Sequence, residues 1–362
     1  MKTNIYQQIN FNKFLNSFEI KKGLTQLSSY PRYVGIGTHF FCNAKCIFCL
    51  GGNYECFTVE RYKKFFEEKL KNILCKAEVV DFHGYGELLL MPNINKFIKY
   101  INKTLPEQIK TIFTNGIALK NINFFDGKYN VMVSLHASNK SLHKQIVGVD
   151  NFDYIVSNLV NLKKYKNVDV TLYSVLNKLN IDDMENFVKL AAKLKVKNVI
   201  FKYMTIFNRS HFNLSVFMDR NNANDNILKA LKTAKKLGIN ISCPPLFFEK
   251  NKISPVCMQP WNNIYIENQG TVNPCCFSGS HIGNLEKTEF NNLWNNKKYQ
   301  NLRNSILTNK PNDYCSKCIN YNINNINKLS SHITFRKSTY NKLLKFIIDN
   351  KKMFSLSIND II

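Results

Sequence analysis

Residues 33–49 read YVGIGTHFFCNAKCIFC, and this stretch sets a short apolar run directly before three closely spaced cysteines. The run Tyr33–Thr38 has the length and composition of a buried strand. Cys42, Cys46 and Cys49 follow it with the spacing C-x3-C-x2-C. Thiols at this density in one loop serve as metal ligands or as a redox device. The stretch therefore predicts a strand whose carboxyl end carries chemistry.

A short apolar run followed by an amphipathic helical stretch then recurs along the chain. The runs that read as strands are 33–38, 78–83, 109–114, 130–136, 168–175 and 198–203. The helical stretches lie near 59–74, 93–103, 117–125, 152–165 and 182–194. Strands that alternate with helices form parallel βαβ units with right-handed crossovers. The sequence therefore predicts an α/β fold with a partial (βα)6 TIM-like barrel, whose chemistry lies at the carboxyl ends of the strands.

The alternation of strand and helix ends near residue 207. We expect a helix over 225–237, a strand over 239–242, and a hairpin that joins 263–267 to 271–273. A helix near 288–305 and an amphipathic segment at 338–348 follow. We therefore divide the chain into an N-terminal extension (1–30), a barrel (31–210), a connecting segment (211–252), a small cysteine-rich domain with a hairpin and helices (253–325), and a C-terminal tail (326–362).

The 362 residues include 50 Lys+Arg against 25 Asp+Glu, which gives a formal net charge of +25. Such a charge suggests a nucleic acid or an anionic membrane as partner. Only six of the basic residues are arginine, the side chain that phosphate- and base-binding sites favour, and the lysines are spread along the chain. We therefore attribute the charge to overall composition and expect no nucleic-acid partner.

The composition also limits where the protein acts. A hydrophobic fraction of 44% argues against disorder. No stretch approaches the roughly 20 apolar residues of a membrane span, and the N-terminus lacks the apolar core of a signal peptide. An odd number of cysteines, eleven, argues against a disulfide framework. We expect a cytoplasmic protein in which cysteines bind metal.

Three thiolates in one loop leave a metal site one protein ligand short. A closed zinc site uses four protein ligands, and a 4Fe–4S cluster normally takes four cysteines. Cys42, Cys46 and Cys49 therefore fit a four-iron cluster with one iron left open for an exogenous ligand. An electron-transfer protein without catalysis is disfavoured, because its cluster would carry the fourth thiolate.

The C-x3-C-x2-C spacing, with Phe48 before the last cysteine, resembles the radical S-adenosylmethionine (radical SAM) superfamily. In that family the open iron binds the amino and carboxylate groups of S-adenosylmethionine. One electron from the cluster breaks the sulfonium bond, and a 5′-deoxyadenosyl radical abstracts a substrate hydrogen atom. The resemblance implies a 4Fe–4S cluster on Cys42, Cys46 and Cys49, S-adenosylmethionine as second cofactor, and a reducing partner such as flavodoxin or ferredoxin.

Motifs at the other predicted strand ends resemble the cofactor pocket of that family. Gly86-Glu87 matches part of a GGEP-like motif, with Leu88 where proline is usual, and Thr114-Asn115-Gly116 matches the family's TNG. The segment Ile146-Val147-Gly148 resembles one that packs on the adenine. The resemblance implies a cofactor pocket that includes Phe48, Gly84, Gly86, Glu87, Thr114, Asn115, Ser134, Gly148, Asn177 and Tyr203.

His136 stands where the family more often has an acidic residue. It is either an acid or base that faces the substrate or a hydrogen-bonded inner residue, and we favour the second because a single histidine is a weak signal. The sequence assigns no catalytic residue.

A second group of cysteines begins at Cys257, continues through Gly270-x4-Cys275 and ends in Cys315-x2-Cys318. This string resembles the SPASM/twitch extension of many radical SAM enzymes and implies a second, auxiliary 4Fe–4S cluster on these four cysteines. No cysteine follows Cys318, so the shorter twitch form with one auxiliary cluster fits better. A structural zinc site of four cysteines is the rival interpretation.

Four cysteines lie outside these two sets. Cys276 is adjacent to Cys275, and only the family spacing G-x4-C selects Cys275 as the ligand. Cys56, Cys75 and Cys243 are expected to behave as small buried hydrophobic residues.

The leading hypothesis is a radical SAM oxidoreductase that abstracts hydrogen from a small, carbohydrate- or cyclitol-type substrate. The auxiliary cluster would accept the electron or bind the substrate. Residues 1–30 are shorter than a leader-peptide-binding unit, which disfavours a peptide substrate. The alternatives are a maturase that modifies peptides or proteins and, because of the charge, an RNA-binding or RNA-modifying factor.

Overall fold

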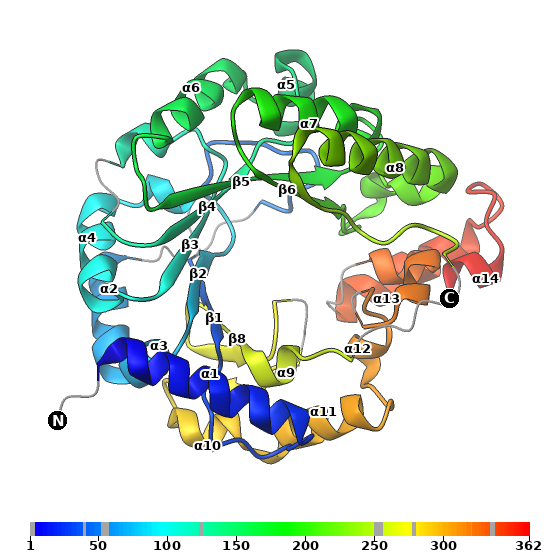
Figure 1. The fold of residues 1–362 in the computed structure, drawn as a ribbon. Coiled ribbons are helices and arrows are strands. Elements are labelled where there is room, and N and C mark those ends of the chain that lie inside the picture. Colours follow the sequence, from blue (N-terminus) through cyan, green and yellow to red (C-terminus); the bar gives the residue numbers. More distant parts are fainter. Residues whose placement is uncertain are drawn as a thin grey trace.

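The computed structural model describes residues 4–38, 41–51, 58–122, 126–249, 256–276, 280–319, 321–333 and 337–362. Within these residues the strands form one ten-stranded sheet in the order β10-β9-β8-β1-β2-β3-β4-β5-β6-β7. Figure 1 shows the sheet curving, with α2 and α4 to α8 along its outer side. The fold is therefore α/β with a partial parallel barrel, as the sequence predicted.

The barrel strands agree closely with the predicted runs, because each run carries enough β-branched and aromatic residues to favour a strand. They are β1 (Tyr33–Gly37), β2 (Val79–His83), β3 (Ile109–Thr114), β4 (Tyr129–Ser134), β5 (Val168–Leu176) and β6 (Asn198–Tyr203). Each is parallel to the next. The short β7 (Asn240–Ser242) adds a further parallel strand beside β6.

Alternation along each strand divides the side chains between the helices and the barrel interior. On β2, Val80 and Phe82 are buried on the outer side, where Phe82 contacts Phe97 edge-on at 5.3 Å. Asp81 and His83 point the other way. The helices of this half are α2 (Val59–Phe65), the π-helical turn η1 (Phe66–Leu70), α3 (Lys71–Leu74), α4 (Ile94–Thr104), α5 (Lys140–Val147), α6 (Phe152–Leu162), α7 (Met184–Lys193) and α8 (Arg220–Leu237).

The C-terminal part extends the barrel sheet. The expected hairpin is present as β8 (Asn263–Ile266) and β9 (Thr271–Asn273), followed by β10 (Gly283–Asn284). Strand β8 runs parallel to β1, with Gly35 opposite Tyr265. The remaining helices are α1 (Ile5–Lys21), α9 (Gln259–Asn262), α10 (Phe290–Trp294), α11 (Lys297–Leu307), α12 (Asp313–Ser316), α13 (Lys337–Asp349) and α14 (Ile358–Ile361).

Two helix predictions were wrong in detail, and one helix was missed. The helix expected over 117–125 is only a 3-10 turn, η3 (Leu119–Asn121), while residues 123–125 lie outside the described residues. The helix near 288–305 is two helices, because the Asn296 side chain caps α11 by accepting from the N–H of Tyr299. The short α5 was not expected.

No helix in the described part of the chain has the length and apolar character needed to cross a membrane.

Candidate functional site

The loop after β1 places three thiols at the carboxyl edge of the sheet. Cys42 and Cys49 are exposed, and Cys46 is half-buried. The backbone N–H of Ala44 lies 3.5 Å from Cys42 Sγ, and that of Gly51 lies 3.4 Å from Cys49 Sγ. Donors aimed at sulfur favour the thiolate form. At Cys42, desolvation raises the pKa of the thiol, and the Ala44 donor lowers it by a smaller amount.

Repulsion between the thiolates of this loop favours the binding of a metal cation. Burial, together with the charges of Cys49 and Cys42, raises the pKa of the Cys46 thiol to about 12. Three thiolates that repel one another are stabilised by the positive charge of iron, and thiolate is the ligand that iron–sulfur clusters take. Among the described residues, no group of three or more His, Cys, Asp and Glu side chains forms a site for a single metal ion.

A neighbouring loop holds the cysteine loop in place. Lys45 and Ile47 donate backbone hydrogen bonds to the carbonyls of Val147 and Ile146, both at 2.9 Å. Gly148 has a positive φ of 74°, and a Cβ there would lie 2.8 Å from the Lys45 carbonyl oxygen. The predicted pocket residue Gly148 thus permits the close approach of the two loops.

His211 adds a contact that sequence reasoning missed. It lies in the 3-10 helix η5 (Arg209–Phe212), is buried, and accepts from the N–H of Phe207 at 3.2 Å through Nδ1. Burial lowers its pKa, although the nearby backbone of Thr205 and Ile47 acts in the opposite direction. The connecting segment therefore touches the cysteine loop. No local pattern in the sequence marks this role.

Glu87 joins the ends of β2 and β3 to the cysteine loop. Its buried carboxylate accepts from the backbone N–H of Asn115 at 2.6 Å and of Leu89 at 3.0 Å. Its own N–H donates to the Phe41 carbonyl at 2.9 Å. Burial raises the Glu87 pKa to about 7 against the effect of these hydrogen bonds. Glu87 is thus fixed in one orientation at the centre of the predicted pocket.

Asn115 and Gly84 lie beside this carboxylate. The Asn115 amide donates to Asn43 Oδ1 at 2.7 Å and lies 3.7 Å from Cys42 Sγ. A Cβ on Gly84 would lie 2.7 Å from the Thr38 carbonyl oxygen, so only glycine fits there. The Thr114 hydroxyl accepts from the N–H of Gly116 at 3.0 Å. Of the predicted residues, Glu87 and Asn115 therefore contact the cysteine loop directly, and Gly84, Thr114 and Gly86, whose φ is 98°, lie on the strand ends beside them.

The predicted residues on β4 to β6 are engaged differently. Ser134 ends β4 opposite Tyr173, half-buried. Asn177 is fully buried, and its amide closes a local turn through Val175 and Leu179. Tyr203 donates its hydroxyl to the Pro245 carbonyl at 3.2 Å and stacks on Phe247. The cofactor roles of Asn177 and Tyr203 stay predictions, since both side chains already have protein partners.

His136 is a hydrogen-bonded inner residue, as favoured from the sequence. It is buried with φ 63°, and its Nδ1 accepts from the N–H of Val175 at 3.1 Å. Its ring meets Phe48 edge-on at 5.0 Å. Burial lowers the His136 pKa to about 3, so the imidazole is neutral. His136 therefore positions Phe48 in the cysteine loop.

The second group of cysteines gathers beyond the hairpin. Burial, together with the charges of Cys257 and Cys318, raises the Cys315 pKa to about 12. The backbone N–H of Cys315 donates to Asn312 Oδ1 at 2.9 Å, which caps α12. These three thiols are close enough to influence one another's charge. Cys75 and Cys243 are half-buried, and Cys56 lies outside the described residues.

The adjacent Cys275 and Cys276 face different surroundings. Burial raises the pKa of Tyr299, the Arg303 guanidinium lowers it, and Cys275 raises it by a smaller amount. Desolvation raises the pKa of the Cys276 thiol, and the Asp81 carboxylate and Cys318 raise it further, whereas Lys202 lowers it. Both cysteines thus remain candidates for the fourth ligand.

An inner wall of polar side chains faces the barrel interior beside Cys276, and sequence reasoning missed it. We define the inner wall as Asp81, His83, Tyr173, Lys202 and Tyr265. Burial raises the Asp81 pKa, and the Thr111 hydroxyl hydrogen-bonds its carboxylate. Burial raises the Tyr173 pKa to about 12, with Cys276 adding to the effect. The signal in the sequence that could have identified the inner wall is the presence of polar residues at inward positions of otherwise apolar strands.

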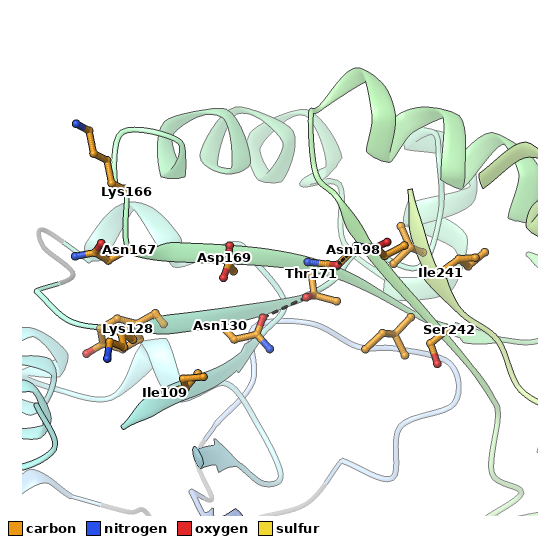
Figure 2. A pocket seen from close by; sticks show the side chains of 14 residues that line it. Ile109, Lys128, Asn130, Lys166, Asn167, Asp169, Thr171, Asn198, Ile241 and Ser242 are labelled. Atoms are coloured by element: carbon orange, nitrogen blue, oxygen red, sulfur yellow. Dashed lines mark hydrogen bonds between the residues drawn. The ribbon is translucent and has the colours of Figure 1, made fainter. Parts of the chain in front are cut away.

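A cavity of about 620 Å³ lies at the opposite, amino-terminal ends of β3 to β7. Figure 2 shows Asn130, Asp169 and Thr171 along its wall, with the Thr171 hydroxyl donating to Asn130 Oδ1 at 3.2 Å. It contains none of the predicted site residues.

Two family models match the chain. Residues 36–191 match the radical SAM superfamily, and residues 257–319 match SPASM, an iron–sulfur cluster-binding domain. The first range contains Cys42, Cys46 and Cys49, and the second contains Cys257, Cys275, Cys315 and Cys318.

Curated relatives resemble only part of the chain. A probable GTP 3′,8-cyclase from Saccharolobus islandicus is 27% identical over 169 residues, which are 44% of this chain and 52% of the relative. A probable GTP 3′,8-cyclase from Saccharolobus solfataricus is 26% identical over 169 residues, with the same coverage. The chain therefore spans about half the length of the curated relatives it matches.

Solved structures resemble more of the chain. The structure of anSMEcpe with bound AdoMet and Cp18Cys peptide superposes with a TM-score of 0.60 at 16% identity, covering 88% of this chain and 97% of that one. Streptococcus suis SuiB bound to precursor peptide SuiA gives 0.58 at 15% identity, covering 84% and 73%. These similarities establish a shared fold.

Proposed function

This chain belongs to the radical SAM superfamily and carries a C-terminal SPASM iron–sulfur cluster-binding domain, and from that premise we propose that it modifies a peptide. The observation that carries the proposal is the extent of the shared fold. It covers 88% of this chain and 97% of anSMEcpe, whose structure holds a peptide. A peptide substrate replaces the carbohydrate-type substrate that the sequence favoured.

The first three cysteines are the proposed ligands of the SAM-binding 4Fe–4S cluster. When bound, this cluster and S-adenosylmethionine supply a 5′-deoxyadenosyl radical, which abstracts a hydrogen atom from an unreactive carbon. The chain's own part is to present the three thiols in one loop, with the N–H donors of Ala44 and Gly51 directed at the sulfurs of Cys42 and Cys49. Glu87 fixes the neighbouring strand ends, and Phe48 and His136 shield one side from water.

The second group of cysteines is the proposed site of one auxiliary 4Fe–4S cluster. Cys257, Cys315 and Cys318 supply three ligands, and Cys275 supplies the fourth. Arg303 supports this region from inside. Its guanidinium donates to the carbonyls of Pro260 at 3.0 Å and Thr25 at 2.8 Å. The fully buried Arg303 thereby ties the N-terminal segment to the cysteine domain.

The inner wall is suited to a peptide because it offers both signs of charge and neutral donors. The Asp81 carboxylate accepts from a peptide N–H or ammonium, and Lys202 donates to a carbonyl or carboxylate. Burial raises the pKa values of Tyr173 and Tyr265, so both phenols remain protonated donors. The stacked rings of His83 and Tyr265 give a flat side chain or amide a surface to lie on.

Substrate-stimulated turnover tests the proposal. Cluster-loaded protein is incubated anaerobically with S-adenosylmethionine, dithionite and one of three additions: a pool of synthetic random-sequence peptides, a panel of monosaccharides and cyclitols, or GTP. We expect the peptide pool to increase 5′-deoxyadenosine release and to yield peptides of changed mass. Stimulation by sugars, cyclitols or GTP, with peptides inert, would overturn the proposal.

Metal analysis of the second site completes the test. We expect iron and sulfide at that site after anaerobic preparation, with visible absorbance that decreases in a Cys315→Ala variant. Zinc in place of iron at the second site would contradict the auxiliary cluster.

A further inference from the structure

Helix α1 presents its polar side chains to the protein and its aromatic side chains to the solvent. Asn12, Asn16 and Glu19 are buried on the inner face. The Asn12 amide donates to the carbonyls of Tyr30 and Lys76, both at 3.1 Å. The Asn16 amide donates to the Trp261 carbonyl at 2.9 Å, and Glu19 accepts from the N–H of Ser28 at 2.6 Å. Hydrogen bonds therefore fix the helix in place.

The outer face of α1 carries three phenylalanines in one line. Phe11, Phe14 and Phe18 have exposed fractions of 66%, 71% and 48%, and their spacing of three and four residues places them on one face. We call these three residues the aromatic stripe. Figure 1 shows α1 on the outside of the molecule, in front of α9 to α11. The stripe contributes little to the core, so its exposure calls for a partner.

Lysines flank the stripe at its carboxyl end. Lys21 and Lys22 are exposed, and Lys22 Nζ lies 5.9 Å from the centre of the Phe18 ring. The whole chain carries a formal net charge of +25. An exposed aromatic face with lysines at its end combines the two contributions to binding at the surface of an anionic membrane, which are buried apolar area and attraction to the lipid charge. The partner should therefore be apolar at the contact and negatively charged around it.

A second copy of the chain does not meet these requirements. A buried aromatic side chain covers about 150–250 Å², so three that are half to two-thirds exposed offer well under the roughly 800 Å² per partner of a stable dimer. Two copies would also repel each other through their charge. The stripe lies along the outer face of one helix, which suits a planar, deformable surface.

We propose that the aromatic stripe docks this enzyme on the surface of membranes that contain anionic lipids. Phe11, Phe14 and Phe18 enter the boundary between headgroups and acyl chains, and Lys21 and Lys22 contact the lipid phosphates. The docking is peripheral, since α1 lies along the surface. It gives a function to the two lysines beside the stripe, and it does not depend on the identity of the substrate.

Vesicle co-sedimentation of the full-length, cluster-loaded protein tests the docking. The probes are vesicles of phosphatidylcholine alone and vesicles of phosphatidylcholine with an equal part of phosphatidylglycerol. We expect binding to the mixed vesicles that weakens at high salt and falls about tenfold or more when Phe11, Phe14 and Phe18 are all replaced by Ser. The matched control is Leu228→Ser with Leu231→Ser, which alters exposed apolar residues on α8 and should leave binding unchanged.

Three outcomes would overturn the proposal. The first is equal binding by the stripe variant and the wild type, with unfolding midpoints that confirm both are folded. The second is binding that does not distinguish the two vesicle types. The third is evidence that the stripe binds another partner while the protein does not bind vesicles. Such evidence would be dimers in light scattering, or salt-sensitive binding of tRNA, that the Ser substitutions abolish.

Discussion

The imidazole of His83 stacks on the phenol ring of Tyr265, with 4.8 Å between ring centres and 20° between planes, although β1 separates the strands that carry them. The rings meet over Gly35, where a Cβ would lie 2.8 Å from a Tyr265 ring carbon and 3.0 Å from His83 Nε2. A Cβ on Gly37 would lie 3.1 Å from the Tyr265 hydroxyl. The two glycines of YVGIG therefore make room for the inner wall.

Replacing Gly35 with Ala should displace this ring pair. The added Cβ forces the rings apart, and overpacking of this kind costs about 1–3 kcal/mol of unfolding free energy. We expect lower stability in denaturant titrations, a changed near-UV circular dichroism signal and slower substrate turnover. The control is Ile36→Val on the opposite face of β1, which should cost about 0.5–1.5 kcal/mol and leave the near-UV signal intact. Identical near-UV signals for Gly35→Ala and the wild type would contradict the proposed packing.

Replacing Gly148 with Ala should loosen the cysteine loop. The new Cβ would lie 2.8 Å from the Lys45 carbonyl oxygen, so the two loops must separate. We expect less iron per chain after anaerobic reconstitution and weaker visible absorbance. Gly238→Ala is the matched control, because Gly238, directly after α8, also has a positive φ, 66°, but a Cβ there meets no atom within 4 Å. Equal iron loss in both variants would assign the effect to backbone strain instead of the contact.

His332 should make stability depend on pH. Its ring is buried against Tyr203, Phe217 and Phe247, and burial lowers its pKa from 6.5 to about 4. Above pH 6.5 the His332 ring is neutral in both the folded and the unfolded chain. Below pH 6.5 the ring takes up a proton in the unfolded chain but not in the folded chain. Stability therefore falls as the pH drops from 6.5 towards 4, by about 2 kcal/mol at pH 5.

Comparison with His332→Gln isolates this contribution from that of the other buried histidines. Its loss of stability between pH 7 and pH 5 should be smaller than that of the wild type. Parallel curves of unfolding free energy against pH would show that His332 does not titrate in this way.

The sequence was sufficient for the barrel because its signals are local. Val80 and Phe82 alternate with Asp81 and His83, and each run ends where a motif begins. The helix α5 was missed because KSLHKQIV is short and mostly polar. The contact of β8 with β1 joins residues more than two hundred positions apart, and nothing near Tyr265 indicates that partner.

The candidate site, too, could be predicted only where its signals are local in the sequence. Spacing alone identified the cysteine loop, and the motif resemblance identified Glu87 and Asn115 beside it. The inner wall and His211 were missed because their roles depend on tertiary neighbours. The sequence also did not indicate that α1 would bury Asn12 and Asn16 and expose Phe14. The two amides are buried because they donate hydrogen bonds to the carbonyls of Lys76 and Trp261, which lie far away in the sequence.

The central claim is that Cys42, Cys46 and Cys49 hold the cluster that cleaves S-adenosylmethionine, separately from the second group of cysteines. The most direct test measures 5′-deoxyadenosine release by reduced, cluster-loaded variants. We predict background release from Cys42→Ala, Cys46→Ala and Cys49→Ala, and retained release from Cys315→Ala and from the control Cys75→Ala. Release that survives in Cys42→Ala, or that disappears in Cys315→Ala with the first cluster intact, would contradict the claim.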